Sequence, residues 1–274
     1  MGYGIELVQG HLSDAASTGA QALTAGNQQS FTVRATAGGS AAVCLEAVIA
    51  SFQAAGDLRI RSPRMHDDVN AVRLQATAGV PTVVAAEGFR QRLYSQDTPT
   101  VEAVFTTAPT AAEISIAGLL NYYDDVPGIA AVYKTWAELA PSIVDYLAVP
   151  VSPTSGATAG DWGTGVALNS TVDVFKANTL YALVGCIAQG AAAANGLWAI
   201  QGVDTGNLLV GGAINNSPTD QRRWFWWLEQ VTGKPSIPVV NSQNKASTLA
   251  FAATQTASTA VELSLLFAQL STAP

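Results

Sequence analysis

The chain has 274 residues, of which 49% are hydrophobic and only 12% are charged. This balance excludes an intrinsically disordered chain and allows one large core or two smaller ones. The formal net charge of −7 argues against a duplex nucleic-acid binder, which needs a basic face. One group of arginines is interrupted by Asp67 and Asp68, and we interpret it as a solvated or subunit-contacting face: Arg59, Arg61, Arg64 and Arg73.

The first part of the chain reads as short strands with one helix among them. Apolar or alternating runs bounded by turn residues predict strands. Residues 64–78 are predicted to be a helix, because Met65, Val69, Val72 and Ala76 share one helical face. The predicted strands on either side of it are 30–37, 42–51, 57–62, 81–86, 100–108 and 113–123.

A connecting segment follows at residues 124–164. Residues 133–149 predict a short helix broken near Pro141, because proline interrupts a helix. The stretch "PVSPTSGATAGDWGTG" has the composition of a linker or an extended arm.

The second part repeats the order of strands, helix and strands. Ser217 can cap the helix, Pro218 suits its first turn, and Gly233 followed by Pro235 ends it. The uncharged run 180–203 contains Gln189, Asn195 and recurrent glycine, so it predicts two strands and not a membrane span. The predicted strands are 179–188, 196–203, 207–214, 237–241, 247–255 and 260–270, of which the last two are expected to form a hairpin.

Five short matches between the two parts indicate an internal duplication. Their sequence shifts lie between about 147 and 154 positions, and they keep the same order along the chain. We therefore predict that residues of roughly 20–123 and 165–272 are two copies of one unit. The matches are "QQSFTV" with "NTLYAL", "GDLRI" with "GNLLV", "LQATAGVP" with "LEQVTGKP", "SQD" with "SQN", and "EISI" with "ELSL".

The second helix holds an unusual run of aromatic residues. Its predicted core face consists of Trp224, Trp227, Leu228 and Val231, and Trp226 falls on the opposite side among charges. Because tryptophan and arginine are enriched at interface centres, a subunit contact is predicted there. Cover by a loop of the same chain is the alternative. The candidate interface residues are Trp226, Phe225, Arg222 and Arg223.

Residues with catalytic chemistry are scarce in this sequence. Two histidines, His11 and His66, are too few for the metal site of a cupin-type oxygenase. Cys44 and Cys186 lie in apolar runs and are predicted to be reduced thiols, although a disulfide stays open. The pair Asp124 and Asp125 reads as a solvated turn. We expect no enzyme, no cofactor and no metal.

The whole pattern resembles the double jelly-roll major capsid proteins of tailless icosahedral phages and their adenovirus-like relatives. The likeness rests on two strand-rich units in tandem, each with a helix before its last three strands, and on the frames "LQATAGVP", "LEQVTGKP", "EISI" and "ELSL". It implies a mainly β fold of two antiparallel jelly-roll sandwiches. It also implies an N-terminal arm at 1–25, a first jelly roll at 26–123, the connecting segment at 124–164 and a second jelly roll at 165–274.

The function implied by this resemblance is a capsid protein that self-assembles, as pseudo-hexagonal trimers, into an icosahedral shell. The partners would be further copies of the chain, other virion proteins and, as a further candidate, an internal membrane, without sequence-specific nucleic-acid contacts. The protein would be made in the host cytoplasm and reside in the virion. The alternative is a carbohydrate- or receptor-binding sandwich of lectin or spike type, with Trp162 in "GDWGTG" as its best candidate residue.

Overall fold

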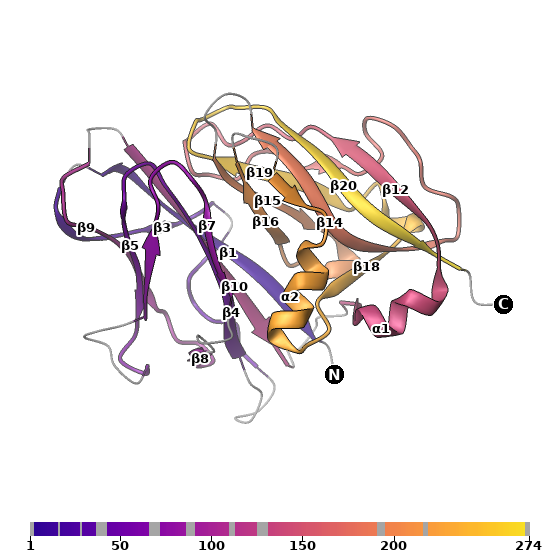
Figure 1. Cartoon of the computed structure of the whole chain (residues 1–274), viewed down its shortest axis with the longest axis horizontal. Coiled ribbons are helices and arrows are strands. Elements are labelled where there is room, and N and C mark those ends of the chain that lie inside the picture. Colours follow the sequence, from indigo (N-terminus) through magenta and orange to yellow (C-terminus); the bar gives the residue numbers. More distant parts are fainter. Residues whose placement is uncertain are drawn as a thin grey trace.

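The protein is almost entirely β-structure, arranged as four antiparallel sheets that form two sandwiches (Figure 1). The predicted fold class, mainly β with two tandem antiparallel sandwiches, is confirmed. The computed structural model describes residues 3–15, 17–27, 29–36, 43–65, 72–85, 91–109, 113–124, 131–190, 195–215 and 219–271.

The first sandwich is built from the N-terminal strands. One sheet has the order β3-β1-β10-β4-β7, with β8 also paired to β4, and the other has the order β2-β9-β5-β6. Between them lies a core that includes Val48, Phe52 and Leu58. The strands are β1 (Gly4–Ala15), β2 (Gly19–Ala22), β3 (Thr24–Ala25), β4 (Val43–Phe52), β5 (Gly56–Arg61), β6 (Val72–Ala76), β7 (Thr82–Ala85), β8 (Gln91–Leu93), β9 (Thr100–Phe105) and β10 (Glu113–Tyr123).

The second sandwich uses the rest of the chain. Its sheets have the orders β11-β18-β14-β20-β12, with β17 also paired to β14, and β13-β19-β15-β16. Trp198, Phe225 and Phe267 are among the large side chains of its core. The strands are β11 (Tyr133–Lys134), β12 (Ile143–Val151), β13 (Val166–Ala167), β14 (Leu180–Gly190), β15 (Gly196–Gln201), β16 (Val210–Ile214), β17 (Thr219–Gln221), β18 (Ile237–Asn241), β19 (Leu249–Thr254) and β20 (Val261–Leu270).

Few helices accompany these strands in the described part of the chain, and those helices are short. The α-helices are α1 (Trp136–Leu139) and α2 (Trp224–Thr232), and the 3₁₀ turns are η2 (Ala140–Ser142), η3 (Val203–Thr205) and η4 (Ser242–Asn244).

Both sandwiches have the same strand order. In the first, β1-β10-β4-β7 faces β2-β9-β5-β6, and in the second β12-β20-β14-β18 faces β13-β19-β15-β16. Eight strands remain in each sandwich when the short strands β3, β8, β11 and β17 are set aside. Counted along the chain, one sheet combines the first, eighth, third and sixth of them. The other sheet combines the second, seventh, fourth and fifth. Two four-stranded sheets that exchange strands in this way form a jelly roll. The chain therefore contains two jelly rolls of identical topology.

Only part of the sequence matching that suggested a duplication falls on equivalent strands. "EISI" and "ELSL" lie in β10 and β20, and "SQD" and "SQN" precede β9 and β19. The other three pairs are wrong, because their members lie in elements that do not correspond. For example, "GDLRI" lies in β5, the fourth strand, whereas "GNLLV" reaches only the start of β16, the fifth strand.

The two jelly rolls stack in one direction, so that the sheets form four layers (Figure 1). The sheet β1-β10-β4-β7 lies inside the stack and packs against β15 and β16 of the second sandwich. Its strand β10 is therefore buried on both faces. The sheet β2-β9-β5-β6 forms one end of the molecule, and the sheet β12-β20-β14-β18 forms the other (Figure 1).

Polar contacts tie the jelly rolls together across this junction. The Leu7 amide donates to the Leu209 carbonyl at 2.7 Å, and the Gln255 side chain donates to the Ser51 carbonyl at 2.9 Å. The Lys234 ammonium lies 3.0 Å from the carboxylate of Glu46, whose side chain is only 3% exposed. It also lies 4.2 Å from the centre of the Tyr122 ring. Apolar packing and a mostly buried ion pair together hold the two rolls in one arrangement.

Several predicted elements are corrected by the structure. The helix expected at 64–78 is wrong where it can be seen, because Val72–Ala76 forms β6, and residues 66–71 lie outside the described residues. The burial of β6 alternates, with Leu74 and Ala76 facing the core, as in a half-buried strand. The expected hairpin of the last two strands is also wrong, since β19 and β20 belong to different sheets.

Segments assigned to an arm and to a connection contribute strands to the jelly rolls. β1 lies within the predicted arm and pairs with β10 along nearly its whole length. β12 lies within the predicted connecting segment and pairs with β20 from Ile143 to Val151. The short helix broken near Pro141 is present as α1 and η2, and β12 begins directly after them.

Candidate functional site

Helix α2 interrupts the sixth strand of the second jelly roll. β14 pairs with β17 before the helix and with β18 after it, just as β4 pairs with β7 and β8 in the first roll. The place of α2 in the first roll is thus taken by residues 86–90, which lie outside the described residues. The helix ends as predicted, at Gly233 with a φ of 65°, a left-handed value that suits glycine.

The start of α2 and the set of its buried side chains both differ from the prediction. The helix starts at Trp224, whereas Thr219–Gln221 forms β17. The buried side chains of α2 are Trp224, Phe225, Leu228, Glu229 and Thr232.

Phe225 is not accessible to a partner, because its side chain is 0% exposed. Its ring meets the indole of Trp198 edge-on, with 6.2 Å between ring centres. Trp226 and Trp227 are half-buried, while Arg222 and Arg223 are exposed. Trp226, Arg222 and Arg223 therefore form the accessible part of the predicted set.

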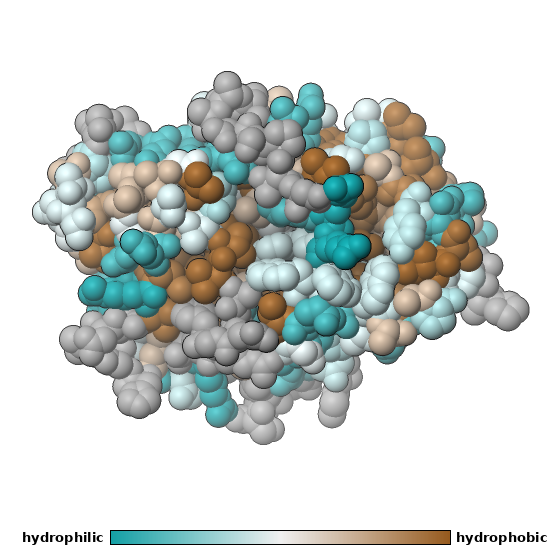
Figure 2. Space-filling view, in the orientation of Figure 1, coloured by the Kyte–Doolittle hydropathy of each residue, from teal (hydrophilic) through white to brown (hydrophobic). Residues whose placement is uncertain are grey.

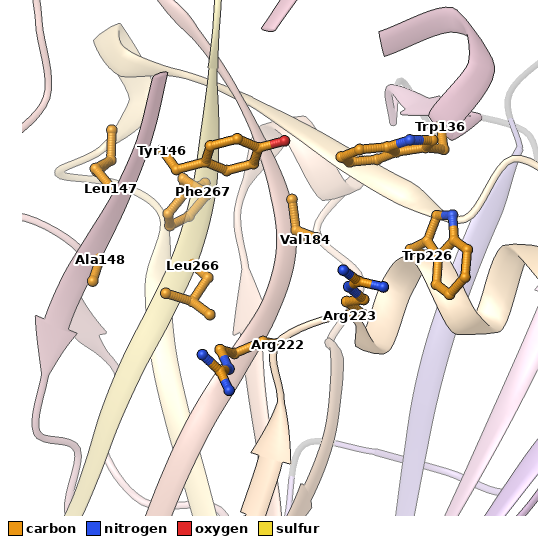
Figure 3. Close-up of a pocket in the computed structure, with 10 residues that line it drawn as sticks. All are labelled: Trp136, Tyr146, Leu147, Ala148, Val184, Arg222, Arg223, Trp226, Leu266 and Phe267. Atoms are coloured by element: carbon orange, nitrogen blue, oxygen red, sulfur yellow. The ribbon is translucent and has the colours of Figure 1, made fainter. Parts of the chain in front are cut away.

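These three residues border a hollow on the outer face of the end sheet. The hollow has a volume of about 880 Å³. Tyr146 and Ala148 of β12 pair in register with Ala268 and Leu266 of β20, and residues paired in this way share one face of a sheet. We call this the aromatic hollow, lined by Trp136, Tyr146, Leu147, Ala148, Val184, Arg222, Arg223, Trp226, Leu266 and Phe267 (Figure 3).

The aromatic hollow has an apolar floor and aromatic sides. Figure 3 shows Leu266 and Val184 between the ring of Tyr146 and the guanidinium groups, with Trp136 and Trp226 at the far side. The guanidinium of Arg223 lies 5.6 Å from the centre of the Trp226 ring, which is a cation–π distance. None of the described residues that line the hollow is acidic. The site thus combines aromatic area with positive charge.

A hydrogen bond between the two helices positions the aromatic sides. The Glu229 carboxylate of α2 accepts from the backbone amide of Trp136, the first residue of α1, at 2.6 Å. Burial raises the pKa of the Glu229 carboxyl above its ordinary value, and this hydrogen bond opposes the rise. Glu229 therefore connects the helix that carries Trp226 to the one that carries Trp136.

Exposed apolar residues extend beyond the aromatic hollow. Tyr146 is 61% exposed, and Val144 on the same strand is 58% exposed. Leu180 at the start of β14 is 45% exposed. Hydrophobic residues gather at the end of the molecule where β12 and β20 lie (Figure 2). Apolar patches of this kind mark interaction surfaces more often than scattered single residues do.

The sequence prediction missed the residues that β12 and α1 contribute to this site. Residues 133–149 read as a helix interrupted by Pro141, so Tyr146 and Ala148 were not expected on a sheet. The usable signal was Ile143–Val151 itself, a run rich in β-branched residues that begins two residues after Pro141. Such a run favours a strand.

Other sequence candidates lie away from the aromatic hollow. Trp162, the candidate for a sugar-binding platform, is 2% exposed and donates its indole N–H to Gln29 at 3.0 Å. His11 is a buried residue of β1, with its Nδ1 3.8 Å from an Asp161 oxygen. Asp124 lies 4.0 Å from the Lys234 ammonium. A buried indole cannot stack on a sugar, so Trp162 itself is not an exposed aromatic platform.

The remaining candidates are distributed as follows. His66 and Asp125 lie outside the described residues. Cys44 and Cys186 are both free thiols, and Cys186 is buried, which raises the pKa of its thiol. In the described part of the chain, no group of three or more His, Cys, Asp or Glu residues is arranged to hold a metal ion. The described helices are also too short to cross a membrane.

Comparison with solved structures gives weak likenesses, among them the two described next. No family model matches the chain, and no curated protein matches it. The crystal structure of the PBSX exported protein XepA is 11% identical, with a TM-score of 0.27, over 96% of this chain and 86% of that one. The crystal structure of the STIV MCP is 8% identical, with a TM-score of 0.20, over 96% of this chain and 97% of that one. Likenesses this weak carry no argument about function.

Proposed function

We propose that the chain is a structural subunit of a viral shell, which self-assembles as trimers of pseudo-hexagonal outline into an icosahedral capsid. The observation that carries this proposal is the pair of jelly rolls with one strand order, stacked in one direction. This architecture is what the sequence resemblance to double jelly-roll capsid proteins leads one to expect. In that setting the protein acts in the virion, is made in the host cytoplasm and has no enzymatic activity or cofactor.

The junction between the two jelly rolls supports a rigid building block. Buried apolar side chains, the Leu7–Leu209 hydrogen bond and the Lys234–Glu46 ion pair fix one roll on the other. A shell subunit benefits from such rigidity, because ordering a flexible partner during assembly costs conformational entropy.

The aromatic hollow supports the choice of further copies of the chain as the main partners. Interface centres are enriched in tyrosine, tryptophan and arginine, and depleted in lysine and acidic residues. Tyr146, Trp226 and Arg223 provide that composition on an open sheet face. Other virion proteins and an internal membrane stay candidates for additional contacts.

Sedimentation velocity across a range of protein concentrations tests the proposal. The full chain should form trimers or larger species, and Trp226→Ala should shift their formation to higher concentration. The substitution Val203→Ala, at an exposed valine outside the hollow, is the matched control and should change nothing. A chain that stays monomeric at every concentration, or that binds a glycan array as a small species, would contradict the proposal.

A further inference from the structure

Strand β12 forms an accessible edge of the second jelly roll. It is the last strand of the sheet β11-β18-β14-β20-β12, and among the described residues no further strand pairs with its outer side (Figure 1). The strand is also apolar there, with Val144 58% and Tyr146 61% exposed. An accessible apolar edge strand is a template to which a strand of another chain can be added.

The equivalent edge of the first jelly roll is covered within the chain. β1 takes the place of β12 in that roll, and β3 pairs with part of it. The Gln29 side chain accepts from the Gln9 amide at 2.8 Å and donates to the Leu7 carbonyl at 2.6 Å. The Leu7 amide donates to Leu209 of the second roll at 2.7 Å. The chain thus satisfies the outer edge of β1 and leaves that of β12 exposed.

The pairing register of β12 shows which of its amides face outward. Opposite residues of antiparallel strands alternate between pairs that exchange hydrogen bonds and pairs that do not. Pro150 lies opposite Ser264 and has no amide hydrogen, which makes this a pair of the second kind. Tyr146 and Ala148 precede Pro150 by four and two residues in an unbroken register. Their amides therefore also point away from β20.

Two of these three outward positions offer no donor to an added strand. The Tyr146 amide donates to the Asp145 carboxylate at 2.8 Å, and Pro150 has no amide hydrogen. Of the three, only Ala148 presents a donor at the edge. The outward carbonyls can still accept, but an incoming strand would find one donor where a regular edge presents three. The exposed charge of Asp145 further disfavours strand pairing.

We infer that Asp145 and Pro150 close the edge of β12 to strand addition, including addition of an edge strand from a second copy of this chain. A partner then meets this end of the molecule through side chains of the sheet face and not through the backbone. Charged residues and proline on edge strands are means by which sheets avoid uncontrolled pairing. The inference does not depend on the shell function, because a monomer carries the same accessible edge.

Opening the edge tests the inference. Asp145→Ala/Pro150→Thr removes the acceptor of the Tyr146 amide and adds a donor at residue 150. In a Trp226→Ala background, which weakens contacts through the face, this double change should cause association at a concentration about tenfold lower than in the background alone. Sedimentation velocity measures the shift. Each single change adds one outward donor and should give an intermediate shift, which keeps the test valid if the double change destabilises the fold.

The matched control makes the same changes in charge and proline content away from any strand. Asp173→Ala/Pro63→Thr, in the same background, alters two exposed residues outside the strands and should leave association unchanged. If the edge variants associate no more readily than this control, the inference is overturned.

Hydrogen exchange locates the new contact. In the associated double variant, the amides of residues 146, 148 and 150 should exchange about tenfold more slowly than in the dilute chain. The amides of Leu147 and Val149, which face β20, should change little. Slowing without this alternation would show that the variant associates elsewhere and would overturn the inference.

This inference and the shell function fail separately. If the unaltered chain stays monomeric at every concentration, the shell function fails and the closed edge stands. If the unaltered chain forms shells in which a neighbouring strand adds to β12, the shell function stands and the closed edge is wrong. Electron cryomicroscopy of those shells would show such a strand directly.

Discussion

The sheets at the two ends of the molecule are the two different sheets of the jelly roll, and their outer faces differ in chemistry. On the first jelly roll, the outer face of β2-β9-β5-β6 carries Glu102 between two arginines, with Arg59 at 2.6 Å and Arg61 at 3.0 Å. On the second, the outer face of β12-β20-β14-β18 carries Tyr146 and Trp226 around an apolar floor. An ion-paired face is compatible with water, whereas an aromatic face is stabilised by being covered. Stacking two jelly rolls in one direction therefore exposes one sheet of each kind, and the two exposed sheets carry different surfaces.

Helix α2 contributes to both the core and the surface of the second roll. It adds Phe225 to the core and Trp226 to the surface from neighbouring positions. We expect Phe225→Ala to cost about 3–5 kcal/mol of unfolding free energy, because it leaves a cavity beside Trp198. Trp226→Ala should cost about 1 kcal/mol or less while weakening assembly. Urea unfolding separates the two, and similar losses for both would contradict the division into core and surface positions.

Breaking the junction between the rolls should have the next largest effect. Lys234→Met leaves the Glu46 carboxylate buried without its nearby ammonium, and we expect a loss of about 3 kcal/mol. Lys245→Met, which removes the exposed ion pair with Asp173, is the matched control and should cost clearly less, because water screens an exposed pair. Equal unfolding midpoints for the two variants would show that the Lys234–Glu46 pair does not hold the rolls together.

Acid should affect the two rolls in opposite directions. Burial raises the pKa of Glu102, but hydrogen bonds from Arg61 and Arg59 outweigh it and leave the pKa below its ordinary value. The stability that the Glu102 ion pairs contribute is therefore present above the unfolded-state pKa of about 4.5. It is lost as pH falls through the lower folded-state pKa. The pKa of Glu229 is shifted in the opposite direction. The stability that this carboxyl contributes is present below the unfolded-state pKa and is lost as pH rises through the folded-state pKa.

Unfolding midpoints between about pH 3 and pH 7 check these signs. Glu102→Gln should flatten the loss of stability at the acidic end, and Glu229→Gln should reduce the loss toward neutral pH. A Glu102→Gln variant that keeps the full acidic loss would show that another carboxylate is responsible for it.

The smallest expected effect concerns the end of α2. Gly233 has a left-handed backbone, so Gly233→Ala should cost about 1 kcal/mol. Gly19 on β2 also has a positive φ, of 92°, with open space around it, which makes Gly19→Ala the matching change in the first roll. Hydrogen exchange should localise the loss to the second roll for Gly233→Ala and to the first roll for Gly19→Ala. If exchange increased equally in both rolls, the prediction that each loss stays in the substituted roll would be wrong.

The sequence predicted the strands with continuous apolar runs best. β14 and β15 are buried at most of their described positions and β20 at alternate ones, and runs of these kinds predict strands. The helix predicted at 64–78 failed because Val72 and Ala76 also fit a spacing of four residues. The alternation of Val72–Ala76 was present in the same residues, and pairing with β5 decides in favour of the strand.

The candidate site was predicted in part. The chain pattern identified Trp226, Arg222 and Arg223 as a set, and the structure brings them to one hollow. It could not place Phe225, because the face of a helix that is buried depends on what the helix packs against. It also could not supply Tyr146 or Leu266, since they join the site only through the pairing of β12 with β20.

Electron cryomicroscopy of the concentrated full-length chain would test the central claim most directly. The account predicts closed assemblies in which every subunit contributes two stacked jelly rolls and in which the face of β12 and β20 is covered by a neighbouring copy. Assemblies that leave this face exposed to solvent, or particles no larger than one chain, would contradict it.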